Sequence, residues 1–208
     1  MSAALKLVLG LTALSLLPGA LLAITSFTRI AIVLSFVRRA IGTQTLPPNQ
    51  TLIGLSLFLT LFTMWPVLQK VNTQAVEPVR EGTIGMREGF DRAAAAFRDF
   101  MVPRTRERDL ALFVEISGAE PPATPQDVPM LVAVPAYVIS ELRTAFEMGL
   151  VIFVPFVVID LVVSAILLAL GMMMLPPALV SAPVKLLLFV LVDGWHLVVR
   201  SLVESVAP

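Results

Sequence analysis

Four long apolar regions restrict what this chain can fold into. They span 5–37, 52–68, 148–174 and 178–203. A helix that crosses a bilayer needs about 20 such residues, so hydropathy alone predicts four spans. The first region begins like a signal peptide, with Lys6, an apolar stretch and Pro18-Gly19-Ala20, but its apolar run continues past any cleavage point. The sequence therefore predicts an all-α membrane protein.

The composition agrees with helices that meet lipid, other subunits, or both. Of the 208 residues, 57% are hydrophobic and 14% are charged, so the chain has more apolar surface than its own core can hide. The net charge of zero argues against nucleic-acid binding by counterion release. The chain has no cysteine, a single histidine and no glycine-rich phosphate loop. We therefore expect no enzyme activity, no metal and no cofactor.

A short motif, Gly-x-x-x-Leu-Pro-Pro, occurs twice, each time between two apolar runs. Proline ends one helix and is well placed to start the next, so each copy reads as the bend of a helical hairpin. The bend residues are Gly42, Pro47, Pro48, Gly171, Pro176 and Pro177. The alternative is two unrelated proline turns.

The bends and the composition divide the chain into three segments. The first hairpin is 1–71, a charged helical insertion is 72–128, and the second hairpin is 129–208. Helical spacing predicts amphipathic helices over 85–101 and 104–116 of the insertion. Arg38 and Arg39 have no acid near them, which places the first bend on the cytoplasmic side and the insertion outside the cytoplasm.

Ionisable residues lie inside or beside the apolar regions. One such charge costs roughly 2.5–3.5 kcal/mol at a helix centre in a bilayer, so these residues are expected to be buried in protein or between subunits. Asp160 and Lys185 lie at matched depth on either side of the second bend, which predicts an ion pair; a proton relay is the alternative. The candidate charges are Arg29, Glu141, Arg143, Asp160, Lys185 and Asp193, with His196 and Arg200 on the predicted helical face of Asp193.

Three consecutive methionines, Met172, Met173 and Met174, occupy the second bend. Methionine is unbranched and polarizable, and it fills irregular gaps without one fixed shape. Packing in the core of a tight hairpin is one explanation, and a soft-metal site is a weaker one.

Long stretches of the chain resemble the FliP family of the bacterial flagellar type III export apparatus. The resemblance rests on "TSFTRIAIVLSFVRRAIGTQTLPPNQTL", "RTRERDLALF", "PAYVISELRTAFEMG", "GMMMLPP" and "KLLLFVLVDGW". The virulence-associated secretion paralogue SctR is similar in the same places. The family resemblance implies a pentamer that forms a helical ring with FliQ and FliR, a gate for unfolded flagellar proteins in the inner membrane.

The resemblance carries further expectations. It implies a flagellar basal body location partly on the periplasmic side, FlhA and FlhB as partners, and FliO as a helper in assembly. It also maps a pore gasket onto Met172–Met174. Two other functions stay open from the residues alone: a small-solute or ion transporter, and a structural assembly nucleus without a conducting role.

Overall fold

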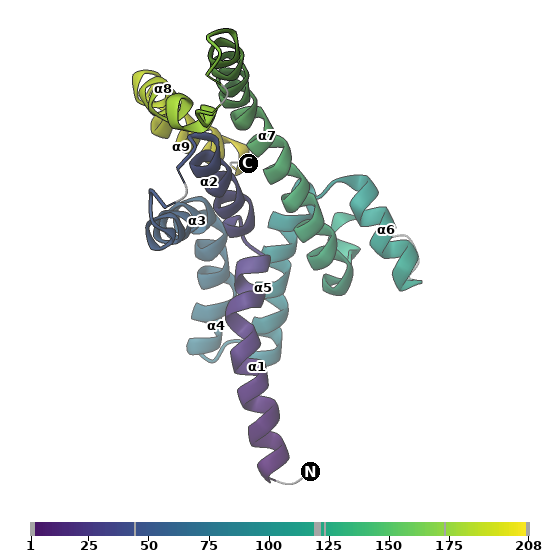
Figure 1. The fold of residues 1–208 in the computed structure, drawn as a ribbon. Helices are drawn as coiled ribbons and strands as arrows, with labels where there is room; N and C mark the ends of the chain where they lie inside the picture. Colours follow the sequence, from purple (N-terminus) through teal and green to yellow (C-terminus); the bar gives the residue numbers. More distant parts are fainter. Residues whose placement is uncertain (1–2, 44, 119–121, 123, 173, 207–208) are drawn as a thin grey trace. The chain divides into compact units, whose positions relative to one another are not determined.

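The protein is helical throughout the part that the structure, a computed structural model, describes. That part comprises residues 3–43, 45–118, 122, 124–172 and 174–206. Figure 1 follows the helices along the chain. The α-helices are α1 (Ala3–Ala23), α2 (Phe27–Ala40), α3 (Asn49–Val71), α4 (Glu77–Arg80), α5 (Met86–Met101), α6 (Glu107–Ser117), α7 (Met130–Ala169), α8 (Pro177–Leu191) and α9 (Gly194–Val206). A π-helix, η1 (Asn72–Val76), and two 3-10 turns, η2 (Val102–Arg104) and η3 (Pro125–Asp127), complete the order.

The chain forms two compact units. The first consists of Met1–Thr28 and Met64–Glu141, and the second of Arg29–Thr63 and Leu142–Pro208. The segments predicted from composition, 1–71, 72–128 and 129–208, divide the chain along its length and stay a prediction.

The core of the second unit is built on one face of α2. Apolar residues recur there at helical spacing, so a single stripe of the helix is removed from solvent. The stripe consists of Ile30, Val33, Leu34, Val37 and Ala40. It belongs to one cluster with Leu52 of α3, Ala145 and Phe156 of α7, Phe189 of α8, and Val198 and Leu202 of α9.

Helix α3 buries small hydroxyl side chains that need no partner from another helix. Ser56 donates to the carbonyl oxygen of Leu52 at 2.7 Å, and Thr60 donates to that of Ser56 at 2.6 Å. Each hydroxyl thus satisfies its donor inside its own helix. Small residues on a helix face let a neighbouring backbone approach closely, which suits an apolar helix bundle.

The helices alter the count of spans that hydropathy predicts. Among the described residues, two helices are long and apolar enough to cross a membrane, 49–80 with 32 residues and 130–169 with 40. The pair α8 and α9, bent by 64°, is a third if it acts as one span. The first apolar region is divided after Ala23 into α1, with 21 residues, and α2, whose 14 residues are fewer than the about 20 that a span needs; neither is among the candidates found in the described residues. The described residues therefore give two or three candidate spans rather than four.

The insertion contains the two helices that the sequence predicts, with one shifted boundary. Helix α5 matches the predicted 85–101 closely, and its apolar residues Ala96, Phe100 and Met101 are buried. Helix α6 begins at Glu107 rather than at Arg104. The chain first makes the 3-10 turn η2 around Pro103, because proline suits the first turn of a helix and not its interior.

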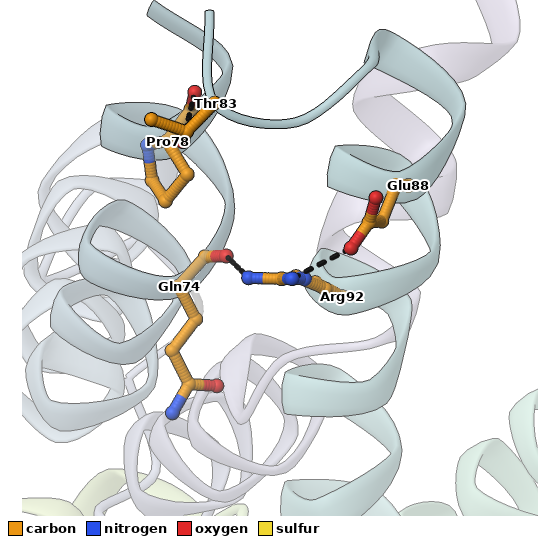
Figure 2. A network of polar contacts seen from close by, with 5 residues as sticks. All are labelled: Gln74, Pro78, Thr83, Glu88 and Arg92. Carbon is orange, nitrogen blue, oxygen red and sulfur yellow. Dashed lines mark hydrogen bonds and ion pairs between the residues drawn. The ribbon is translucent and has the colours of Figure 1, made fainter. Parts of the chain in front are cut away.

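A polar network connects η1 and α5 within the first unit (Figure 2). The Arg92 guanidinium on α5 donates to the main-chain oxygen of Gln74 at 3.4 Å and to Glu88 at 2.6 Å (Figure 2). Thr83 donates to the carbonyl oxygen of Pro78 at 2.9 Å and so fixes the turn after α4 (Figure 2). These contacts order the insertion independently of the second unit.

Candidate functional site

The second Gly-x-x-x-Leu-Pro-Pro motif ends α7 by backbone hydrogen bonds alone. Gly171 has a φ of +74° and its N–H donates to Leu168 O at 3.0 Å, while the Met172 N–H donates to Leu167 O at 2.9 Å. This pair of bonds is a Schellman motif, which needs a left-handed residue that glycine adopts without strain. Pro177 then occupies the first turn of α8, where its missing N–H leaves no bond unmade.

The first copy of the motif also ends a helix at its glycine. Gly42 has a φ of +86° and its N–H donates to Arg39 O at 3.1 Å, just past the end of α2. The carbonyl oxygen of Pro48 accepts from Leu52 at 3.2 Å, which opens α3, and Pro47 lies in the bend. Pro176 holds the corresponding capping position before α8. Both predicted bends therefore lie between two helices, each with glycine ending one helix and proline beginning the next.

The two methionines of the second bend that the structure describes, Met172 and Met174, lie outside the chain's own core. Met174 is 97% exposed and Met172 is 45% exposed, while Met173 lies outside the described residues. Packing within the hairpin core, the alternative drawn from the sequence, does not hold for Met172 and Met174. Their thioethers are available to another chain.

Asp160 of α7 and Lys185 of α8 form the ion pair expected from their depth around the second bend. The Lys185 ammonium lies 2.5 Å from Asp160 Oδ2, and the Ser181 hydroxyl donates to Asp160 Oδ1 at 2.6 Å. Each carboxylate oxygen thus accepts one hydrogen bond from α8. Ser181 was missed by the sequence reading, although it lies one helical turn before Lys185 and so shares its face.

The two partners of this pair differ in their access to solvent. The Lys185 side chain is 7% exposed, whereas that of Asp160 is 42% exposed. A buried ammonium needs a paired anion, because water does not reach it to replace the lost interaction. The exposed part of the carboxylate can still accept from water or from a further chain.

The other candidate charges differ in their exposure to solvent. Arg29 and Glu141 are buried; the Arg29 guanidinium donates to the carbonyl oxygen of Ser205, in the last turn of α9, at 2.6 Å. Arg143 and Asp193 are exposed in this chain, so for these two the expected contact with another subunit stays a prediction.

Asp193 lies in the break between α8 and α9 rather than on a helical face. Its φ is +51°, and its carbonyl oxygen accepts from the Leu197 N–H at 3.2 Å, which begins α9. Aspartate tolerates this left-handed conformation better than most residues. Arg200 pairs with Glu204 at 2.7 Å instead of with Asp193 or His196.

Large apolar side chains remain exposed along the candidate spans. On α7 and α8 they include Leu161, Val162, Leu168, Leu187 and Leu191. Contiguous exposed apolar surface of this kind marks contact with lipid or with other protein chains. Within the described residues, no group of three or more histidine, cysteine or acidic side chains is placed to hold a metal ion.

Comparison with known proteins identifies the family to which the chain is similar. The sequence profile of the FliP family matches residues 10–202. The chain is 50% identical over 204 residues to the flagellar biosynthetic protein FliP of Bacillus subtilis (strain 168), covering 98% of this chain and 92% of that protein. It is 54% identical over 195 residues to the protein of the same name from Pectobacterium carotovorum subsp. carotovorum, covering 94% of this chain and 76% of the relative.

The similarity extends to a distant source. The flagellar biosynthetic protein FliP of Aquifex aeolicus (strain VF5) is 46% identical over 202 residues, covering 96% of this chain and 84% of that protein. These relatives are named for flagellar biosynthesis, and none of the three names describes an enzyme. The range that the family profile matches spans both proline bends, the Asp160–Lys185 pair and the second bend. The chain belongs to the FliP family.

Proposed function

We propose that this chain is a subunit of the flagellar type III protein export gate. In this proposal, copies of the chain assemble as a pentamer with FliQ and FliR in the bacterial inner membrane, at the flagellar basal body and partly on its periplasmic side. Unfolded flagellar proteins pass through the centre. FlhA and FlhB are further partners, and FliO acts during assembly. Family membership supports the flagellar role.

The exposed methionine bend is the observation that carries the proposal. Its conformation is set by Gly171 and Pro177, so the thioethers of Met172 and Met174 are not needed to hold the bend. A ring of such side chains around an axis can exclude water and ions by dewetting. It can also deform around a polypeptide of any sequence, since methionine surfaces accept many partners.

The uncovered helices support assembly rather than action as a single chain. Helices α7 and α8 expose apolar side chains, and the side chain of Asp160 on α7 is 42% exposed. Lipid tails do not solvate a carboxylate, and sister subunits or partner proteins do. An assembly that surrounds this face satisfies the apolar and the charged groups together.

The test replaces Met172, Met173 and Met174 with alanine in the whole assembly in cells. We expect the resting membrane to conduct small ions, because alanine leaves gaps in the seal, while export continues at a reduced level. The control is Met86→Ala, which removes another exposed methionine, at the start of α5 in the first unit. Unchanged conductance in the triple variant, or equal leakage in the control, would contradict the proposal that these methionines seal the resting gate.

A small-solute or ion transporter is the second candidate, favoured by the half-exposed Asp160 within an apolar helix. The mass of the detergent-extracted complex separates the two. A ring with FliQ and FliR supports the export gate, and a monomer or dimer that takes up solute supports the transporter.

Crosslinking of a stalled export substrate to position 172, but not to position 86, distinguishes a conduit from a structural assembly nucleus. Because the virulence gate is a close paralogue, the identity of the crosslinked substrate decides between the flagellar and the virulence system.

A further inference from the structure

Two arginines at the end of α2 lack a carboxylate partner among the described residues. Arg38 donates through Nη1 to the Pro47 carbonyl oxygen at 3.4 Å and to the side-chain oxygen of Asn49, and both acceptors are neutral. Arg39 is exposed, and no contact with a described residue occupies its guanidinium. Two positive charges at adjacent positions therefore remain uncompensated in this part of the second unit.

The same two arginines line an open pocket. Its volume is about 360 Å³, and its walls are Arg38, Arg39, Gly42 and Thr43. An aliphatic carbon of Lys185 approaches Gly42, but the Lys185 ammonium is held by Asp160. The pocket thus presents the charge of two guanidiniums without an acid to neutralise it.

Two carbonyl oxygens at this helix end lie near donors of the chain itself. The carbonyl oxygen of Arg39 accepts from the Gly42 N–H at 3.1 Å, and that of Arg38 lies 3.3 Å from the Thr43 hydroxyl, whose single proton is shared with the Leu46 carbonyl oxygen. Guanidinium groups present a planar fork of N–H donors that matches the oxygens of a phosphate group. The pocket therefore suits a phosphate-bearing ligand.

We propose that this pocket binds the phosphate group of an anionic phospholipid. Helix α3 starts at Asn49, beside the pocket, and is one of the candidate spans. Its exposed side chains Ile53, Leu57 and Phe58 follow within the first turns and offer an apolar surface to acyl chains. A phospholipid carries both chemistries, an anionic headgroup and apolar tails, whereas free phosphate carries only the first. The proposal does not depend on the export function.

Native mass spectrometry of the full chain in detergent micelles tests the proposal. The probes are phosphatidylglycerol and phosphatidylcholine with identical acyl chains, and inorganic phosphate as a competitor. The variant is R38Q/R39Q, and the matched control is R80Q/R87Q, which removes two exposed arginines from the first unit. We expect the natural sequence and the control to prefer phosphatidylglycerol by about tenfold or more, and the R38Q/R39Q variant to lose that preference.

Each outcome decides for or against the site. Equal retention of the two lipids by the natural sequence, or undiminished preference in R38Q/R39Q, overturns the proposal. Displacement of phosphatidylglycerol by millimolar inorganic phosphate shows a free-anion site and also overturns it. If R38Q/R39Q fails to fold, the single variant Arg39→Gln applies, because Arg39 is exposed and makes no hydrogen bond or ion pair with a described residue. Its preference for phosphatidylglycerol must then fall while that of Arg87→Gln does not.

Discussion

The unequal exposure of Asp160 and Lys185 predicts unequal losses when either partner is removed. Asp160→Ala leaves the Lys185 ammonium unpaired at 7% side-chain exposure, and loss of one partner from a buried pair costs about 3 kcal/mol. Lys185→Met keeps an apolar stem in place and leaves a carboxylate that is 42% exposed and still bonded to Ser181. Water can solvate that carboxylate, so the expected loss is about 1 kcal/mol.

Unfolding of the detergent-solubilised protein by sodium dodecyl sulfate, followed by far-UV circular dichroism, measures both losses. The two single variants and D160A/K185M form a double-mutant cycle, with an expected coupling of about 2 kcal/mol in the free energy of unfolding. The charge swap D160K/K185D is expected to recover part of the stability that Asp160→Ala loses. The pair Arg200–Glu204, whose side chains are 65% and 63% exposed, is the control, with an expected coupling of about 0.3–0.5 kcal/mol.

Two results would refute this reasoning. A coupling no larger than that of the Arg200–Glu204 control would mean that the close contact of Lys185 with Asp160 contributes nothing to stability. A larger loss from Lys185→Met than from Asp160→Ala would mean that the burial of the ammonium does not set the cost.

Two further predictions concern helix ends. Arg29→Gln should lower the free energy of unfolding by about 2 kcal/mol and speed amide exchange at the end of α9, because the charged hydrogen bond to Ser205 O is lost. Ser205→Ala keeps the charged bond to Ser205 O and removes the 3.2 Å contact of Arg29 with the hydroxyl and the hydroxyl's own 2.8 Å bond to Leu202 O, so it should affect exchange less than Arg29→Gln does, and equal effects would contradict this assignment. Gly171→Ala and Gly42→Ala should each destabilise the protein by about 1–2 kcal/mol because alanine at positive φ is strained. Gly54→Ala, inside α3 with open space around its Cβ, should instead stabilise by a few tenths to about 1 kcal/mol in thermal unfolding, and destabilisation there would count against the explanation.

The bends and the ion pair could be predicted because their causes are local. Gly42 and Gly171 end their helices through bonds to the preceding turn, and proline opens the next helix through its own ring. Once the second bend is placed, two residues at equal distance from it meet on facing helices. The Asp160–Lys185 ion pair could therefore be predicted without knowledge of the rest of the fold.

The end of α1 at Ala23, inside the first apolar region, was not predicted from hydropathy because it depends on one threonine side chain. Thr25 donates its hydroxyl to Leu22 O at 3.0 Å and accepts from the Phe27 N–H at 3.4 Å, so its side chain replaces backbone bonds of a continuous helix. A single threonine in an apolar run rarely has this effect, and hydropathy does not register it. Conversely, α7 continues through Pro155 to a length of 40 residues, although a proline in the helix interior removes a main-chain hydrogen bond.

The exposure of Arg143 and Asp193 was beyond sequence reasoning for a different reason. The sequence predicts that these charges are covered either by the chain itself or by another subunit, and it does not decide between the two. In the structure both residues are exposed, whereas the core on α2 is formed by residues distant in sequence. Hydropathy records the composition of a segment and carries no information on which face of it is covered.

The main-chain hydrogen bonds at Gly171 fix the shape of the second bend, so the side chains that the bend exposes do not determine that shape. Since main-chain groups and two prolines hold that turn, the side chains at positions 172 and 174 are free to vary over evolutionary time without disturbing the folding of the helices on either side. A saturation library at these positions would therefore return variants that fold and accumulate normally. Any amino-acid preference recovered from such a library under selection for motility would reflect the working requirements of the assembled machine.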